Sequence, residues 1–479
     1  MSTDRLLPRS RPVTVGVDSA GVGAFLDDLA RRRIGLHTIM LLRRGQVYAE
    51  GAWAPHRLSD APLLYSLSKT FTSAAVGIAV ADGAFGYDDP VVGLFADVVD
   101  AAGPVASRIR VRDCLAMATG HTVGVGSITR LAALPGRTPW RAWLATEPSG
   151  EPGETFCYNQ VATWTLAEIV RHATGRSVLD LLRERVFAPL GIAHATWDTD
   201  QRGRILGGTG LHMAPESVAA FFQLLLDDGI RDGERLLPAE WITGYRQRHV
   251  ETAAAETEPD WQQGYGWQVW LDRHGGHRGD GAFGQFALVM PGHDAIVVTT
   301  AHTSDMPGIL DAVWTHLVPA FGALPPLSAL SDANQVARPG TGGDAVLAAR
   351  LSRAALPTVG GERGGAVHLT FENRRNRWRL TDAAHGWDMR WVDASGGDNT
   401  LAVGDRSWQY STMRWGTKTL RVAASGAWVE WGHWVCHVIA LDAPHALLVR
   451  LRDDGSGRVE WVGEAPLLTK TWSGLAVQP

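Results

Sequence analysis

A strongly apolar run between Phe71 and Val80 constrains the fold of this chain more than any other stretch. Its residues are apolar on nearly every face of a helix, which is typical of a helix buried in the core of a large domain. Ser66 and Lys69 come just before the run, three residues apart, so on a helix they would lie on one face. The partial positive charge at the helix N-terminus favours a developing anion near the hydroxyl. The spacing therefore predicts a Ser-x-x-Lys nucleophile, in which the amine takes the serine proton.

The use of lysine in this chain strengthens that prediction. Only three of the 45 lysine and arginine residues are lysines, namely Lys69, Lys418 and Lys470. Arginine stays protonated and cannot act as a base, whereas a desolvated lysine can. The alternative is a solvated lysine at the start of a helix, which would carry no chemistry.

Composition limits the kinds of partner and cofactor. With 479 residues the chain has room for about two to four domains. The net charge of −5 and the absence of a basic block give no reason to expect a nucleic-acid partner. The three cysteines are scattered, and the histidines show no metal-ligand spacing, so we predict no disulfide framework, no metal and no cofactor.

The N-terminal residues 1–18 are polar and contain arginine, without the apolar segment of a signal peptide. The sequence has no run of 18 apolar residues that could form a transmembrane helix. These features predict a protein of the cytoplasm that does not enter a membrane.

Residues 1–324 are predicted to form one α+β domain. A helix is expected at 22–33 and a β-hairpin follows it, whereas the middle of the domain is helical and includes a helix at 215–226. Three strands are then expected at 265–271, 282–290 and 295–301, before a closing helix at 306–320. We expect the strands from the two ends of the domain to share one antiparallel sheet.

Residues 325–345 are rich in Pro, Gly, Ser and Ala, which indicates a linker. In residues 346–479, ten short segments of alternating polarity predict an antiparallel β-barrel or sandwich. Ten of the 20 tryptophans fall in this part of the chain. We expect them to pack as a core, and the alternative is an interior that holds an apolar ligand.

Two further segments carry candidate site residues. Tyr158 precedes a long helical pattern, and its phenol can shuttle a proton to a leaving group. Its neighbours Asn159 and Gln160 are amides that can orient the lysine or the substrate. His302 follows the end of a predicted strand and is a weaker candidate for the site.

The segment 279–284 matches the glycine pattern of a dinucleotide-binding loop, but a polar loop precedes it and a strand follows it, so we reject that interpretation. Gly279, Asp280 and Gly281 instead indicate a glycine-thinned strand start that lets a substrate approach the backbone. The N–H of Ala282 can then pair with that of Ser66 as an oxyanion hole.

Taken together, the segments 65–69, 158–160 and 279–281 resemble the motifs of serine hydrolases related to class C β-lactamases, penicillin-binding proteins and family VIII carboxylesterases. The likeness covers roughly residues 20–320. It implies a β-lactamase/transpeptidase-like fold, followed here by an all-β, lipocalin-like barrel domain. Some relatives with this layout are penicillin-binding-protein-type thioesterases, which cyclise peptides released from a carrier protein.

The resemblance assigns the nucleophile to Ser66, its base to Lys69 and the tyrosine of the Tyr-x-Asn motif to Tyr158. Gln160 stands where that motif has Asn. The third motif, Lys-Thr-Gly in the family, is Gly279-Asp280-Gly281 here, so the cationic and hydroxyl contacts to a β-lactam carboxylate are missing. Asp280, Gly281, Gln160, Asn159 and His302 are thus expected to bind substrate.

Three functions follow from these motifs. The first is a serine hydrolase or acyltransferase that forms an acyl-enzyme on Ser66 from a small-molecule ester or a peptide. The second is a thioesterase that macrocyclises a nonribosomal peptide delivered as a carrier-bound thioester. The third is a binding or sensor protein that has kept the fold without turnover.

Overall fold

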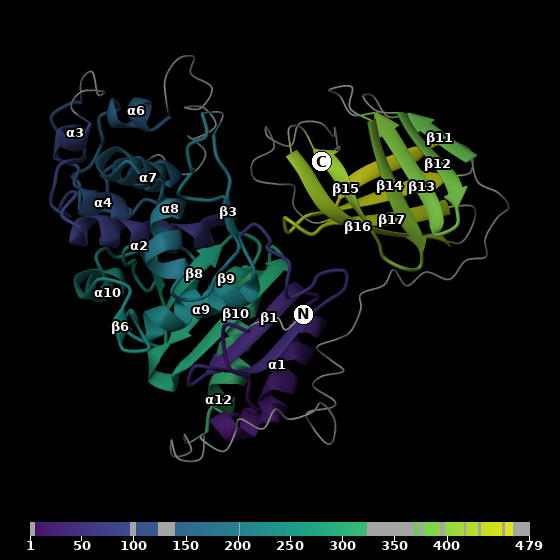
Figure 1. Ribbon diagram of the computed structural model, residues 1–479, viewed down its shortest axis with the longest axis horizontal. Coiled ribbons are helices and arrows are strands. Elements are labelled where there is room, and N and C mark those ends of the chain that lie inside the picture. The colour runs from purple at the N-terminus through teal and green to yellow at the C-terminus, as the bar shows by residue number, and fades with distance from the viewer. Residues whose placement is uncertain are drawn as a thin grey trace.

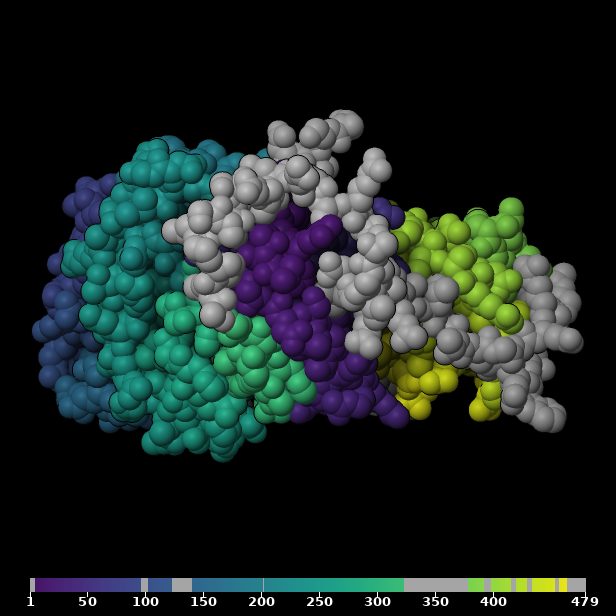
Figure 2. Space-filling model, turned by 90° about the horizontal axis from the view of Figure 1, so that it is seen from below, coloured from purple at the N-terminus to yellow at the C-terminus, as the bar shows by residue number. Residues whose placement is uncertain are grey.

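The computed structural model describes residues 5–95, 102–122, 139–200, 202–322, 368–372, 377–392, 398–415, 418–429, 433–452 and 456–462. A first unit of helices and strands is followed by a second unit of strands alone (Figure 1). The space-filling view places the second unit at one end of the molecule (Figure 2). The linker predicted at 325–345 lies outside the described residues, so the domain limits 1–324 and 346–479 stay predictions.

One antiparallel sheet organises the first unit, with strand order β2-β1-β10-β9-β8-β7. The strands are β1 (Gly35–Arg43), β2 (Gln46–Ala52), β7 (Trp270–Leu271), β8 (His277–Gly281), β9 (Gln285–Met290) and β10 (Ala295–His302). The first strand of the unit pairs along its length with the last, from Gly35 opposite His302 to Arg43 opposite Ala295. This pairing confirms that the two ends of the domain share one sheet.

Both faces of the sheet are buried, because its strands alternate between two apolar cores. In β1, Ile39 and Leu41 point into one core, whereas Met40 and Leu42 point into the other. The first core is covered by α1 (Ser19–Arg31), α11 (Met306–Ala312), η8 (Val313–Leu317) and α12 (Val318–Ala320). The second core is covered by the helical part of the unit, which lies on the opposite side of the sheet (Figure 1).

The apolar run forms α2 (Ser68–Ala81), and twelve of its fourteen residues are buried. The other helices of this part are α3 (Val91–Leu94), α4 (Val111–Leu115), α6 (Pro139–Leu144), α7 (Gln160–Thr174), α8 (Val178–Leu182), the π-helical turn η5 (Arg183–Phe187), α9 (Pro215–Leu226) and α10 (Ala239–Tyr245). Single turns are η1 (Pro12–Val15), η2 (Tyr65–Leu67), η3 (Ala106–Arg108), η6 (Pro259–Trp261) and η7 (Pro291–His293), and two small hairpins are β3 (Ala195–Trp197) with β4 (Leu211–Met213) and β5 (Ile230–Arg231) with β6 (Glu234–Arg235). Helix α2 therefore lies at the centre of the helical part, where its N-terminal end meets the sheet.

The strand prediction was wrong around residues 265–281. The predicted strand 265–271 shrinks to the two residues of β7. Residues 273–281, which we expected to connect that strand to the next, contain strand β8. Strand β8 carries no apolar pattern because its buried residues are His277, Arg278, Gly279 and Gly281. The Arg278 guanidinium is fully buried there and pairs with the carboxylates of Asp272 and Asp280, so the charges compensate one another.

The second unit is one nine-stranded sheet that curls on itself (Figure 1). Its order is β11-β12-β13-β14-β16-β17-β18-β19, and β15 pairs with β16 beside this path. The bounds are β11 (His368–Glu372), β12 (Arg377–Ala383), β13 (Gly386–Val392), β14 (Asp398–Asp405), β15 (Gln409–Trp415), β16 (Lys418–Val429), β17 (His433–Ala440), β18 (Ala446–Arg452) and β19 (Gly457–Trp461). Two of the ten predicted segments merge into β16, and a lipocalin-like barrel remains a proposal.

Five tryptophans of the described residues lie in the core of this unit, as expected: Trp378, Trp387, Trp391, Trp428 and Trp434. Trp378, Trp387 and Trp434 are among the largest fully buried side chains of the described residues. No helix in the described ranges is long and apolar enough to cross a membrane.

The packing of α2 against α10 allows a test of the fold. An added Cβ at Gly77 would lie 2.4 Å from Cγ of Trp241, whose ring is fully buried and cannot move aside. We expect Gly77→Ala to lower the free energy of unfolding by about 1–3 kcal/mol through overpacking. Thermal unfolding followed by tryptophan fluorescence measures the change.

Gly93→Ala is the matched control, because Gly93 lies in helix α3 with open space around its Cα. There the helix preference of alanine should leave the melting temperature equal or higher. An unchanged melting temperature for Gly77→Ala would contradict the close packing of α2 on α10.

Candidate active site

Ser66 lies in the tight turn η2, which leads directly into α2. The residue before it, Tyr65, has a φ of +48°, in the left-handed region that a side chain of this size rarely adopts. The hydroxyl of Ser68 holds the turn, because it donates to Tyr65 O at 2.6 Å and accepts from Leu211 N at 3.1 Å. Ser66 is consequently fixed and half-buried at the N-terminal end of the central helix.

Lys69 follows in the first turn of α2, and its side chain is buried under that turn. Its Nζ lies 3.1 Å from Ser66 Oγ. The same nitrogen donates to the carbonyl oxygen of Gly208 at 2.6 Å and to Oε1 of Gln160. Burial lowers the pKa of Lys69 well below its usual range, and the charge of Asp280 opposes this shift only in part.

These contacts suit an uncharged amine. A neutral amine has two N–H groups, and the oxygens of Gln160 and Gly208 accept both. The lone pair then remains for the hydroxyl hydrogen of Ser66. Depression of the lysine pKa by desolvation is a known way to activate such a pair. The arrangement can therefore take a proton from Ser66 without any change of side-chain position.

Tyr158 stands on the other side of the pair, half-buried just before α7. Its ring lies under Lys69, with Nζ 4.9 Å from the ring centroid, and it stacks on Trp270 with centroids 5.8 Å apart. Burial raises the pKa of the Tyr158 phenol, and its hydrogen bond with Ser66 lowers that pKa to a smaller extent. The phenol therefore stays protonated at neutral pH, which suits a proton relay better than a base.

The two amides after Tyr158 have different surroundings. Gln160 is part of the cluster, because its Nε2 donates to Ser66 Oγ at 3.3 Å while its Oε1 accepts from Lys69. Asn159 is buried and caps α7, where its Oδ1 accepts from Val161 N at 2.9 Å. The structure thus brings Gln160 to Ser66 and places Asn159 as a helix cap.

Gly208 is a member of the site that the sequence analysis missed. Its carbonyl accepts from Lys69, and a Cβ at this position would lie 2.6 Å from Gln160 Oε1 and 3.3 Å from Lys69 Nζ. The absence of a side chain leaves the space that Gln160 and Lys69 occupy. The glycine-rich segment 207–210 was visible in the sequence, but nothing local connects it with Lys69.

Strand β8 lies close to the turn η2, which carries Ser66 and is called the nucleophile turn below. The glycines of β8 permit this close approach. A Cβ on Gly281 would lie 2.2 Å from Leu64 O, and one on Gly279 would lie 2.7 Å from the ring of Phe222. The end of β8 therefore rests against η2, and Ala282 follows in the turn to β9. The glycines thus make room for the protein's own backbone, in addition to any substrate.

Asp280 and His302 lie at the edges of the group. Asp280 accepts from Arg278 Nε at 3.1 Å, and burial raises the pKa of its carboxyl group while Arg278 opposes the shift. His302 ends β10, and its ring packs edge-on against that of Phe283 with centroids 5.3 Å apart. No group of three or more His, Cys, Asp or Glu side chains in the described part of the chain is placed to hold a metal ion.

Comparison with known proteins agrees with this geometry. The family model described as beta-lactamase matches residues 24–318, more than half of the chain. This chain belongs to the beta-lactamase family. The match includes both ends of the six-stranded sheet and all the site segments, which confirms the resemblance stated from the motifs.

Solved structures show the same fold at low identity. EstCE1, described as a hydrolase with promiscuous acyltransferase activity, is 18% identical, with a TM-score of 0.52 over 62% of this chain and 99% of that one. The octameric penicillin-binding protein homologue from Pyrococcus abyssi is 15% identical, with a TM-score of 0.50 over 87% and 97%. At this identity the two structures show that the chain has the same fold.

The state of Lys69 can be measured directly because the chain has only three lysines. We expect the lysine labelled with ¹³C at Cε to show one signal that titrates well below pH 10.5, because burial disfavours the ammonium form. Two-dimensional NMR between pH 5 and 11 follows it, and Lys69→Arg assigns it by its loss. A Lys69 signal that titrates like that of a free lysine would contradict the role of base.

Gly208→Ala tests whether the site needs glycine at position 208 to align Gln160 with Lys69. The new methyl group meets the end of a flexible side chain, so we expect the fold to remain while Gln160 is pushed off Lys69 and Ser66. Loss of this alignment should lower kcat by about 10–100-fold, with a small change in melting temperature. Gly292→Ala is the control, since nothing lies within 4 Å of its added Cβ. Equal activity in both variants would refute the role of Gly208.

Proposed function

We propose that this chain is a serine hydrolase or acyltransferase that forms an acyl-enzyme on Ser66 from an ester or peptide-type substrate. The observation that carries the proposal is the position of the Lys69 amine. This buried amine, whose pKa is lowered, lies 3.1 Å from the hydroxyl of Ser66 at the start of a helix. Membership of the beta-lactamase family supports hydrolysis in general.

In the proposed reaction Ser66 Oγ attacks the carbonyl carbon, and its proton passes to Lys69 Nζ. The N–H groups of Ser66 and Ala282 stabilise the tetrahedral oxyanion. The proton then moves from Lys69 through the Tyr158 phenol to the leaving group, and the carbon–leaving-group bond breaks. The result is an ester between the acyl group and Ser66, with Lys69 neutral again.

Release of the acyl group follows the same steps in reverse. Water or an amine attacks the acyl-enzyme and gives its proton to Lys69, and Ser66 Oγ leaves with that proton. Water yields an acid, and an amine yields an amide.

Asp280 stands in place of the hydroxyl residue of Lys-Thr-Gly and would repel the carboxylate of a β-lactam. We therefore place β-lactams outside the preferred substrates.

The second candidate is a penicillin-binding-protein-type thioesterase that macrocyclises a carrier-bound nonribosomal peptide. One observation favours it. Ala440 and Ala443 of the second unit pack with Leu63, Tyr65 and Phe283 of the first in a single apolar cluster beside the nucleophile turn. A wall of this kind helps to exclude water from an acyl-enzyme and gives an amine the advantage.

Intact-mass spectrometry with an activated peptidyl ester tests the proposal. We expect a mass increase equal to the acyl group in the wild-type protein and none in Ser66→Ala, because that variant lacks the hydroxyl that lies 3.1 Å from Lys69 Nζ. Resolution to an acid with water alone indicates a hydrolase, and preferential formation of an amide or a ring indicates an acyltransferase or cyclase.

Ser73→Ala serves as a control, because Ser73 lies in the same helix, is fully buried, and its Oγ accepts from Trp241 Nε1 at 3.0 Å. It should still form the adduct. The absence of any adduct in folded wild-type protein would favour the binding or sensor protein instead.

A further inference from the structure

A loop of the C-terminal sheet reaches the nucleophile turn. It connects β17 to β18 and includes Asp442 and His445. The Leu63 N–H donates to Asp442 O at 3.0 Å. Two residues after Leu63, at the start of η2, the Tyr65 hydroxyl lies 2.5 Å from Nε2 of His445. Both rings are buried, with exposed fractions of 4% for Tyr65 and 2% for His445.

His445 also contacts the other side of the candidate oxyanion hole. Its ring centroid lies 5.9 Å from that of Tyr65 and 5.1 Å from that of Phe283, and these two rings are themselves 5.3 Å apart. Tyr65 directly precedes Ser66, and Phe283 directly follows Ala282. The imidazole of His445 therefore packs against Tyr65 and Phe283, the sequence neighbours of the two proposed oxyanion donors.

Both of those neighbours have unfavourable backbone conformations. The φ angle is +48° at Tyr65 and +69° at Phe283. Such conformations are strained and persist only where the surroundings hold them. The side chains of Tyr65 and Phe283 are held by one another and by His445. The directions of the two N–H groups thus depend on this three-ring contact.

The geometry points to His445 as a positioning residue for the oxyanion hole, which the C-terminal domain supplies to the catalytic domain. This inference rests on the proposed function, because it assigns a role within the same acyl transfer. It implies that docking of the C-terminal domain completes the site as well as stabilising the protein.

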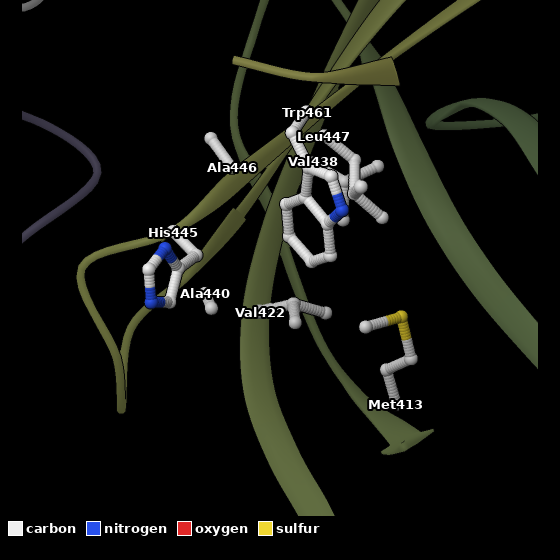
Figure 3. Close-up of a pocket in the computed structure, with 8 residues that line it drawn as sticks. All are labelled: Met413, Val422, Val438, Ala440, His445, Ala446, Leu447 and Trp461. Atoms are coloured by element: carbon white, nitrogen blue, oxygen red, sulfur yellow. The ribbon is translucent and has the colours of Figure 1, made fainter. Parts of the chain in front are cut away.

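The surroundings of His445 fit this role. Arg421 fixes the loop, since it pairs with Asp442 at 2.7 Å and with the buried Asp60 of the catalytic domain at 3.0 Å. Behind the imidazole lies a small apolar cavity in the sheet, lined by Met413, Val422, Val438, Ala440, Leu447 and Trp461 (Figure 3). Burial lowers the pKa of His445 to about 3, and the nearby His302 contributes, so the ring is neutral at neutral pH.

A second contact between the domains provides a control. The Tyr410 hydroxyl donates to Pro55 O at 3.3 Å, and the Arg57 guanidinium lies over the Tyr410 ring at 4.5 Å. These residues join the same two domains and do not touch Tyr65 or Phe283 in the described contacts. Tyr65→Phe and Tyr410→Phe therefore each remove one phenol hydroxyl from the interface, and only the first lies at the oxyanion hole.

The experiment compares the full-length wild-type protein with Tyr65→Phe, His445→Ala, His445→Gln and Tyr410→Phe. The measurements are kcat and KM for an activated peptidyl ester, affinity for a boronic acid that mimics the tetrahedral intermediate, and melting temperature. We expect His445→Ala to lower kcat about 10–100-fold, with KM nearly unchanged, because misplaced donors act on the transition state. Boronic acid affinity should fall in parallel.

The other variants sharpen the result. His445→Gln keeps a polar group near the Nε2 position and should recover part of kcat. Tyr65→Phe should lose kcat, whereas Tyr410→Phe should keep it. In the double variant Tyr65→Phe/His445→Ala, the loss of kcat, expressed as a free energy, should be smaller than the sum of the two single losses. The reason is that both substitutions remove the same contact.

Two results would overturn the inference. One is a wild-type kcat in His445→Ala or, if that variant does not fold, in Tyr65→Phe. The other is an equal loss of kcat in Tyr410→Phe, which would mean that docking alone matters. Wild-type protein that forms no acyl adduct at all would instead overturn the proposed function.

Discussion

The burial of the Lys69 amine beneath the nucleophile turn sets the conditions for the rest of the candidate site. An ammonium group in this position would be costly to desolvate, so the neutral form is favoured. The acceptors around it are an amide and a backbone carbonyl, from Gln160 and Gly208. These polar but uncharged groups orient the amine without raising its pKa as a carboxylate would. The nearest carboxylate, Asp280, is paired with Arg278, which weakens its effect on Lys69.

The close approach of several backbone segments explains why glycines recur around the start of helix α2. Three pieces of backbone converge there: the turn η2, the bend that carries Gly208, and the end of β8. A Cβ on Gly208 or Gly281 would lie within 2.6 Å of a neighbouring oxygen. At Gly281 the neighbour is the backbone oxygen of Leu64, and at Gly208 it is the side-chain oxygen of Gln160. A Cβ on Gly279 would lie 2.7 Å from the Phe222 ring. Glycine at these positions therefore permits the close packing around the start of α2.

The sequence predicted those parts of the structure that have a local signature. The apolar run predicted α2, and the spacing of Ser66 and Lys69 predicted two side chains on one face, whose polar atoms lie 3.1 Å apart. The order of helices and strands predicted that the two ends of the first unit share one sheet. Strand β8 was not predicted as a strand separate from β9, because it shows no apolar alternation and instead carries a buried ion pair and two glycines. Asn159 could have been recognised as a helix cap from its place before α7. Gly208 could not, because only the folded chain brings it to Lys69.

The contribution of the C-terminal domain is also invisible in the sequence, since His445 lies 380 residues from Tyr65. A domain that only stabilised the fold would need an apolar contact of sufficient area anywhere on its partner. Here the contact is made at the turn that carries the nucleophile, and it includes a short hydrogen bond between two buried side chains. A buried polar contact of this kind fixes geometry more strictly than apolar packing does, because a small displacement leaves both groups unsatisfied. The position of the C-terminal domain is therefore coupled to the geometry in which Ser66 would react.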